Sequence, residues 1–117
     1  MLNISIKNTN MDLTLDQQNY VKSKMQNAQK YIGDGDASLF YEVEMDTSAH
    51  SGDIYRAEAR MQIGHDSFYA EAKGSTIESA MDQVKDKFFR ELRRSKTKKS
   101  NAFIKGAQRI KKMLRGE

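Results

Sequence analysis

Alternating hydrophobic and polar residues predict four β-strands in this chain. Residues 2–7 place leucine and isoleucine at every second position, which is the pattern of a half-buried strand. The same alternation recurs near 38–46, over 55–63 and from Phe68 to Lys73. In each of these segments one face is apolar and the other is polar or charged, so we expect a sheet that buries one side.

Helical spacing of apolar residues predicts two helices. The first begins at Thr14, where Thr14 and Gln17 form a capping box, and it ends at Gly33. The second begins in Ser75-Thr76-Ile77-Glu78, which we interpret as another capping box capped by Ser75. The apolar stripes are Val21, Met25, Ala28 and Ile32 in the first helix and Ile77, Ala80, Met81, Val84, Phe88 and Leu92 in the second.

The predicted order of elements is β-α-β-β-β-α, which indicates an α+β fold. A four-stranded sheet with both helices packed on one face is the simplest arrangement that buries every apolar stripe, and it resembles the double-stranded-RNA-binding fold. We expect one domain over residues 1–98 and a basic amphipathic tail over residues 99–117. A free helix of that length is marginal, so we expect the tail to be flexible until it binds a partner.

Charge is distributed unevenly along the chain. Residues 83–117 contain 13 Lys and Arg and three Asp and Glu, a net of +10, whereas residues 1–82 contain seven basic and 13 acidic residues, a net of −6. The formal charge of +4 therefore conceals a strong polarity. A basic segment of this density indicates an anionic partner, with nucleic acid favoured over a membrane surface.

The basic residues of the second helix form a ridge beside its core stripe. Lys87, Arg90, Arg94 and Lys98 fall within an arc of about 80° at helical geometry. Arginine holds phosphate oxygens in pairs and lysine acts as a point charge. Our candidate RNA-binding residues are Lys87, Arg90, Arg93, Arg94, Lys96 and Lys98, with Lys24, Tyr20 and Tyr31 along one edge of the first helix. The alternative is a solvated helix face, with the tyrosines as edges of the core.

No catalytic or metal-binding pattern accompanies these basic residues. The chain has no cysteine, and His50 and His65 both fall in predicted loops without a partner at metal-ligand spacing. Asp82 and Asp86 are one helical turn apart and are better explained as tuning the basic helix than as an acid/base pair. We therefore expect a protein that is not an enzyme, with no cofactor and no small-molecule substrate. Neither a signal peptide nor a membrane span is visible, so we expect a cytoplasmic protein.

Four segments carry a combined pattern of order, length and charge that is shared with a known family. They are LNISIKNTNMDLT, YVKSKMQNAQKYI, AEAKG and, most specifically, SAMDQVKDKFFRELRRSK. In the last segment the positions that match the family's second helix are Asp82, Asp86, Lys87, Arg90, Leu92, Arg94 and Lys96. Over residues 2–98 the chain resembles the ribosome hibernation-promoting factors, also called ribosome-associated translation inhibitors, in a short form without their C-terminal dimerisation domain.

The resemblance implies a function and a partner. It implies binding to the small ribosomal subunit and its rRNA, in the channel where mRNA and the tRNA anticodon ends lie, with translation blocked and the idle ribosome protected. It implies a protein that is monomeric off the ribosome. The chain departs from the family at Thr76, Ile77 and Glu78, where Asp-Met-Tyr is usual, and in its basic tail, where one short branch has an acidic one.

Two other functions stay open at the level of the sequence. A general double-stranded RNA-binding module would bind isolated duplexes without a ribosome. A membrane-surface or partner-docking protein would be led by the basic tail helix, whose apolar positions are Phe103, Ala107, Ile110 and Leu114.

Overall fold

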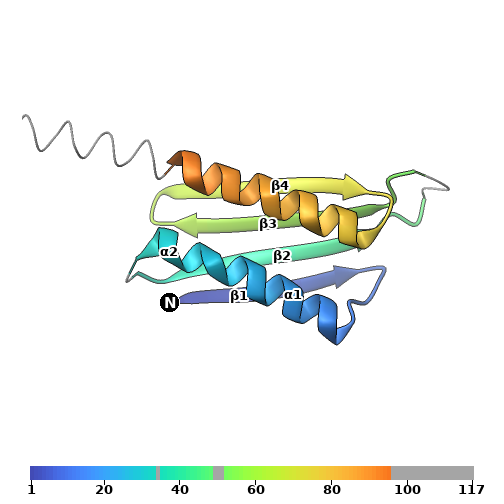
Figure 1. Ribbon diagram of the computed structural model, residues 1–117, viewed down its shortest axis with the longest axis horizontal. Helices are drawn as coiled ribbons and strands as arrows, with labels where there is room; N and C mark the ends of the chain where they lie inside the picture. The colour runs from blue at the N-terminus through green and yellow to red at the C-terminus, as the bar shows by residue number, and fades with distance from the viewer. Residues whose placement is uncertain (34, 49–51, 96–117) are drawn as a thin grey trace, which may run out of the picture.

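The structure, a computed structural model, describes residues 1–33, 35–48 and 52–95. The elements, in chain order, are β1 (Leu2–Thr9), α1 (Leu15–Met25), the 3₁₀ turn η1 (Gln26–Ala28), α2 (Gln29–Ile32), β2 (Ala37–Met45), β3 (Tyr55–Ile63) and β4 (Asp66–Gly74). A last helix follows β4 and is described over residues 77–95; we call it the 77–95 helix. The predicted β-α-β-β-β-α order is confirmed (Figure 1).

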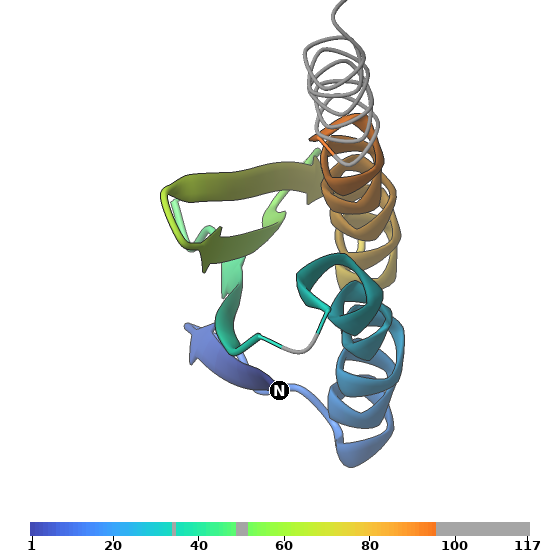
Figure 2. The ribbon, with the colours of Figure 1, turned by 90° about the vertical axis from the view of Figure 1, so that its left-hand side faces the viewer.

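The four strands form one sheet in the order β1-β2-β3-β4. β1 runs parallel to β2, and the β2–β3 and β3–β4 pairs are antiparallel. A parallel pair needs a crossover connection, and the segment from α1 to α2 provides it. Both helices lie on one side of the sheet and leave its other side uncovered, as Figure 2 shows edge-on. The predicted α+β fold is confirmed.

The hydrophobic core lies between the sheet and the two helices. The inward strand residues Leu39, Val43, Ala57, Ala59 and Met61 are fully buried, as the alternation predicts. The helices meet them with the predicted stripes, including Val21, Met25, Val84 and Phe88. No polar or charged residue is buried among those that the structure describes. The charged groups of the described domain therefore lie on its surface, either on the outer side of the helices or on the uncovered side of the sheet.

The predicted first helix is interrupted. Its capping box is confirmed, because the backbone N–H of Gln17 donates to Thr14 Oγ1 (3.1 Å) and the Thr14 N–H donates to Gln17 Oε1 (2.9 Å). The prediction of one continuous helix to Gly33 is wrong, since η1 separates α1 from α2. Each residue of a 3₁₀ turn rotates the chain further about the helix axis than a residue of an α-helix does. The turn η1 therefore changes the direction of Tyr31 relative to the residues of α1. Gly33, with φ of 61°, ends the segment as predicted.

The predicted capping box at Ser75 is also wrong by one residue. The cap is Thr76, whose hydroxyl accepts from the backbone N–H of Ser79 at 3.1 Å. Glu78 accepts from the Nε2 of Gln17 at 3.2 Å and so joins the starts of the two helices. Gly74 packs closely against the first turn of this helix, because a Cβ there would lie 2.9 Å from the backbone nitrogen of Ala80.

We expect Thr76→Ala to lower the free energy of unfolding by about 1 kcal/mol, because it removes the acceptor of a helix N-terminal N–H. Ser75→Ala is the matched control and should change stability by less than about 0.5 kcal/mol. Urea denaturation followed by circular dichroism measures both. A larger loss of stability for Ser75→Ala than for Thr76→Ala would show that Ser75 caps the helix. Equal losses would show that Thr76 is not the dominant cap.

Candidate nucleic-acid interface

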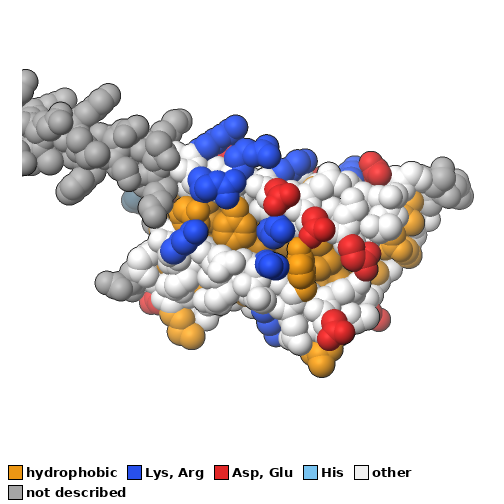
Figure 3. Space-filling model, viewed as in Figure 1, with side chains coloured by type: hydrophobic (Ala, Val, Ile, Leu, Met, Phe, Trp, Pro, Cys, Tyr) orange, Lys and Arg blue, Asp and Glu red, His pale blue; other side chains and the backbone are white. Residues whose placement is uncertain are grey.

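Charged side chains divide the outer surface of the helices into two halves. Figure 3 shows Lys and Arg gathered over the end where the 77–95 helix finishes, and Asp and Glu toward the end where it begins. We call the first group the basic half; it consists of Lys24, Lys30, Lys87, Arg90, Arg93 and Arg94. The second group, the acidic half, consists of Asp16, Glu78, Asp82 and Asp86. All of these residues except Lys24, Lys30 and Asp16 belong to the 77–95 helix.

The 77–95 helix carries its arginines around a hollow beside the start of β4. Arg90, Arg93 and Arg94 line this hollow of about 700 Å³, together with Glu91, Ser95, Ser67 and Phe68. Three arginines and one glutamate around an open depression leave a surplus of positive charge that favours an anion there. Arg94 meets Glu91 at 3.5 Å, a long contact between exposed groups that contributes little.

Lys87 marks the inner end of the basic half. Its Nζ donates to the backbone carbonyl oxygen of Glu71 in β4 at 3.3 Å. This contact places Lys87 on the side of the helix that faces β4, at the rim of the helical layer, where the ridge of basic residues is predicted. Arg90 and Arg94 follow Lys87 on the same helix, and both the ridge and its role in RNA binding stay predictions.

The first helical segment contributes two lysines that each lie over a tyrosine. Lys24 Nζ is 5.8 Å from the centre of the Tyr20 ring, and Lys30 Nζ is 5.3 Å from that of Tyr31. The Tyr31 ring in turn packs against Phe89 with 6.5 Å between ring centres. Sequence reasoning missed Lys30 and Phe89. The signal for Lys30 was its place next to Tyr31, whereas Phe89 lies just outside the core stripe and becomes an interhelical contact only after folding.

Tyr20 lies where the acidic and basic halves meet. Its hydroxyl donates to Asp82 Oδ1, and this bond connects α1 to the 77–95 helix. Partial burial, and then the hydrogen bond and negative charge of Asp82, raise the pKa of Tyr20 to about 12. With its hydroxyl engaged, Tyr20 offers a ring edge rather than a free phenol. Base stacking on Tyr20 and Tyr31 stays a prediction.

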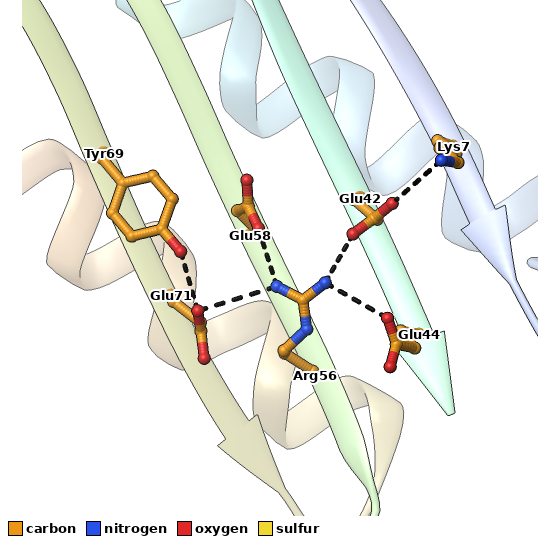
Figure 4. A network of polar contacts seen from close by, with 7 residues as sticks. All are labelled: Lys7, Glu42, Glu44, Arg56, Glu58, Tyr69 and Glu71. Atoms are coloured by element: carbon orange, nitrogen blue, oxygen red, sulfur yellow. Dashed lines mark hydrogen bonds and ion pairs between the residues drawn. The ribbon is translucent and has the colours of Figure 1, made fainter. Parts of the chain in front are cut away.

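The uncovered face of the sheet holds a separate polar network, centred on Arg56. The alternation of the strands predicts that outward Arg56 or Arg60 pairs with Glu44 or Glu71, and Arg56 lies 3.3 Å from Glu44 and 3.7 Å from Glu71. Two closer partners were missed, Glu42 at 2.5 Å and Glu58 at 2.7 Å (Figure 4). These carboxylates raise the pKa of Arg56 above its ordinary value, and the hydrogen bond that Arg56 donates to Glu58 is the largest cause. The Arg56 side chain is only 21% exposed. Arg56 therefore links neighbouring strands and does not serve as a free cation for a ligand.

Some predicted residues lie outside the described part of the chain. They are Lys96, Lys98, the tail stripe from Phe103 to Leu114, and His50. His65 is described and lies in the exposed turn between β3 and β4, as predicted. Across residues 1–33, 35–48 and 52–95, no group of three or more His, Cys, Asp or Glu side chains is placed to hold a metal ion. In the same residues no helix has the length and apolar character that a membrane span requires.

The family follows from the sequence comparison. Residues 4–100 match the sequence model of the family described as sigma 54 modulation protein / S30EA ribosomal protein. The chain belongs to this family. Membership makes it a ribosome-associated modulation factor of the hibernation type, and the family is one of ribosome-binding proteins rather than of known enzymes. No curated protein sequence matches the chain.

Solved structures agree with this fold. One is the N-terminal domain of protein Y from Thermus thermophilus, with a TM-score of 0.64 and 20% identity over 79% of this chain and 97% of that one. Another is a ribosomal subunit interface protein from Coxiella burnetii, with a TM-score of 0.60 and 12% identity over 83% of this chain and 99% of that one. At these identities the likeness establishes the shared fold alone.

The Tyr20–Asp82 bond predicts a pH dependence. Since folding raises the Tyr20 pKa from 10.0 to about 12, its contribution to stability is complete below pH 10 and is lost as the pH rises through the folded value. We expect the wild type to lose more stability than Tyr20→Phe between about pH 9 and pH 11.5, because phenylalanine cannot ionise. Urea midpoints at the two pH values measure the difference. Parallel losses in both proteins would show that Tyr20 does not titrate in this linked way.

Proposed function

We propose that the protein silences idle ribosomes by binding the small ribosomal subunit in the channel that holds mRNA and the tRNA anticodon ends. The observation that carries the proposal is the basic half, in which two helices present cations on one outer surface. A wedge of this shape in that channel would exclude mRNA and tRNA. It would also protect the subunit while translation is stopped.

The chemistry of the basic half suits rRNA phosphates. Arg90, Arg93 and Arg94 surround one hollow, where guanidinium groups can hold phosphate oxygens in pairs. Lys24 and Lys30 lie on the neighbouring segments α1 and α2, where each acts as a point charge. Folded RNA is recognised largely by its shape and backbone, so this surface needs no base-reading motif.

The acidic half favours one orientation of the domain on the ribosome. Phosphates of rRNA would repel the acidic half, which consists of Asp16, Glu78, Asp82 and Asp86. We therefore expect the basic half, and not the acidic half, to lie against the rRNA backbone. A uniformly basic helix layer would bind in many orientations. The division of charge therefore orients the domain on the ribosome, whereas net positive charge alone would only attract it to RNA.

The name of one structural neighbour supports the same partner, because the protein from Coxiella burnetii is titled a ribosomal subunit interface protein. We further propose that the chain acts in the cytoplasm and is monomeric off the ribosome. Residues 1–98 would form the binding domain, and residues 99–117 would add a basic segment that orders on contact with the ribosome.

Charge reversal tests the proposal directly. We expect Arg90→Glu combined with Arg94→Glu to abolish co-sedimentation with small subunits, because it replaces two phosphate contacts by two repulsions. Lys22→Glu combined with Lys73→Glu is the matched control: it makes the same change in net charge at two exposed residues outside the basic half. The control should still bind detectably. Wild-type binding by the Arg90/Arg94 variant would show that the basic half is only a solvated face.

Salt separates the ribosome from an isolated RNA duplex as the partner. With about five phosphates neutralised, affinity for the small subunit should fall by on the order of a hundredfold or more between about 50 and 200 mM salt. The same measurement on a short RNA duplex should give much weaker binding at every salt concentration. Equal affinity for the duplex and the subunit would favour a general double-stranded RNA-binding module.

A further inference from the structure

The uncovered face of the sheet carries two aromatic rings with an arginine between them. The strand register places Phe40 of β2 opposite Arg60 of β3, and Arg60 opposite Tyr69 of β4. The Arg60 guanidinium lies 5.3 Å from the centre of the Phe40 ring. Phe40 and Tyr69 are 49% and 50% exposed. Two half-exposed rings in one row form a patch, which marks an interaction surface more strongly than a single exposed residue does.

Phe40 also forms a wall of a hollow that combines a stacking surface with polar groups. The hollow has a volume of about 280 Å³, and Glu42, Glu58 and Arg60 line it beside the ring. Carboxylates accept hydrogen bonds from N–H groups, and a guanidinium donates to carbonyl or phosphate oxygens. An aromatic ring with acceptors and donors at its rim matches a flat heterocycle that itself carries amino and carbonyl groups.

The Arg56 network holds these acceptors in place. Arg56 donates to Glu42 at 2.5 Å and to Glu58 at 2.7 Å, so both carboxylates have a fixed position beside the hollow (Figure 4). A carboxylate has about four lone-pair sites, so each keeps capacity for a ligand. The hydroxyl of Tyr69 is likewise held, by Glu71 at 2.7 Å, which fixes the second ring of the row.

We propose that this hollow binds one unpaired nucleobase of RNA, stacked on Phe40, with its amino groups donating to Glu42 or Glu58. Arg60, which lies over the Phe40 ring and forms no ion pair with any described residue, would move from the ring to the adjoining phosphate as the base takes its place. Tyr69 would stack the next base along the row. The proposal rests on the proposed function in taking RNA as the partner, and it adds a single-stranded segment on the face opposite the basic half.

A cationic side chain from a protein is a poorer occupant. Lys7, Arg56 and Arg60 already surround the hollow or its rim, and Arg60 already occupies the cation–π position over Phe40. A further lysine or arginine would have to displace Arg60 from the ring, and Glu42 and Glu58 are already paired with Arg56. A base is neutral, and stacking does not depend on charge, so the mixed charges of this face do not oppose it.

A tryptophan introduced at position 40 makes the proposal measurable. The chain has no tryptophan, so Phe40→Trp places a single indole in the stacking position. We expect hexaadenylate and hexauridylate RNA to quench its emission in a saturable way. Leu15→Trp is the control, because Leu15 is 70% exposed on α1, away from the sheet face. Its emission should stay unchanged. Equal quenching of the two variants, or none at position 40, overturns the proposal.

Ring removal gives a second measurement on the same RNA. Anisotropy of a fluorescein-labelled hexamer should show roughly tenfold weaker binding for Phe40→Ala, whereas Phe40→Trp and Tyr69→Phe should bind like wild type. Circular dichroism checks that each variant is folded. Unchanged affinity in folded Phe40→Ala contradicts the proposal, and so does displacement of the hexamer by N-acetylarginine amide, which would reveal a cation site.

The two proposals fail separately. These titrations contain no ribosome, so quenching at position 40 can be observed even if the Arg90/Arg94 reversal leaves ribosome binding intact. Conversely, loss of ribosome binding on that reversal, with no quenching at position 40, would keep the proposed function and remove the base-binding hollow.

Discussion

Burial of both helices against the same face of the sheet is the constraint on which the rest of the structure depends. The apolar stripes of α1 and the 77–95 helix have no other surface to cover, and the fully buried alanines of β3 allow the helices to lie close. With no charged residue buried in the described domain, the charges are sorted onto two outer faces. One face is helical and divided by sign, and the other is a bare sheet with its own polar network.

Electrostatics gives these two faces different tasks. On the helical face, Arg90, Arg93 and Arg94 line one open hollow together with Glu91, and the surplus of positive charge there favours an external anion. On the sheet face, Arg56 is satisfied by four carboxylates and stiffens the strands around it. The first arrangement favours an anionic partner, whereas the ion pairs of the second are made within the chain.

Periodicity predicted the strands, the core residues and the sides of the helices, because alternation and helical spacing are properties of the local chain. It failed where a tertiary contact decides the outcome. The helix is capped by Thr76 rather than Ser75, at the point where Gly74 packs on Ala80, and η1 interrupts the first helix. Arg90 and Arg94 could be placed as neighbours from spacing alone. Lys30, Phe89 and the pairing of Arg56 with Glu42 and Glu58 could not, because each depends on how the neighbouring side chains settle after folding.

A cryo-electron microscopy structure of the protein bound to the small ribosomal subunit tests the central claim most directly. The account predicts that the domain lies in the channel for mRNA and tRNA, with Arg90, Arg93 and Arg94 within hydrogen-bond distance of rRNA phosphates and the acidic half turned away from the phosphate wall. A domain bound elsewhere on the subunit, or bound with its acidic half against rRNA, would contradict it.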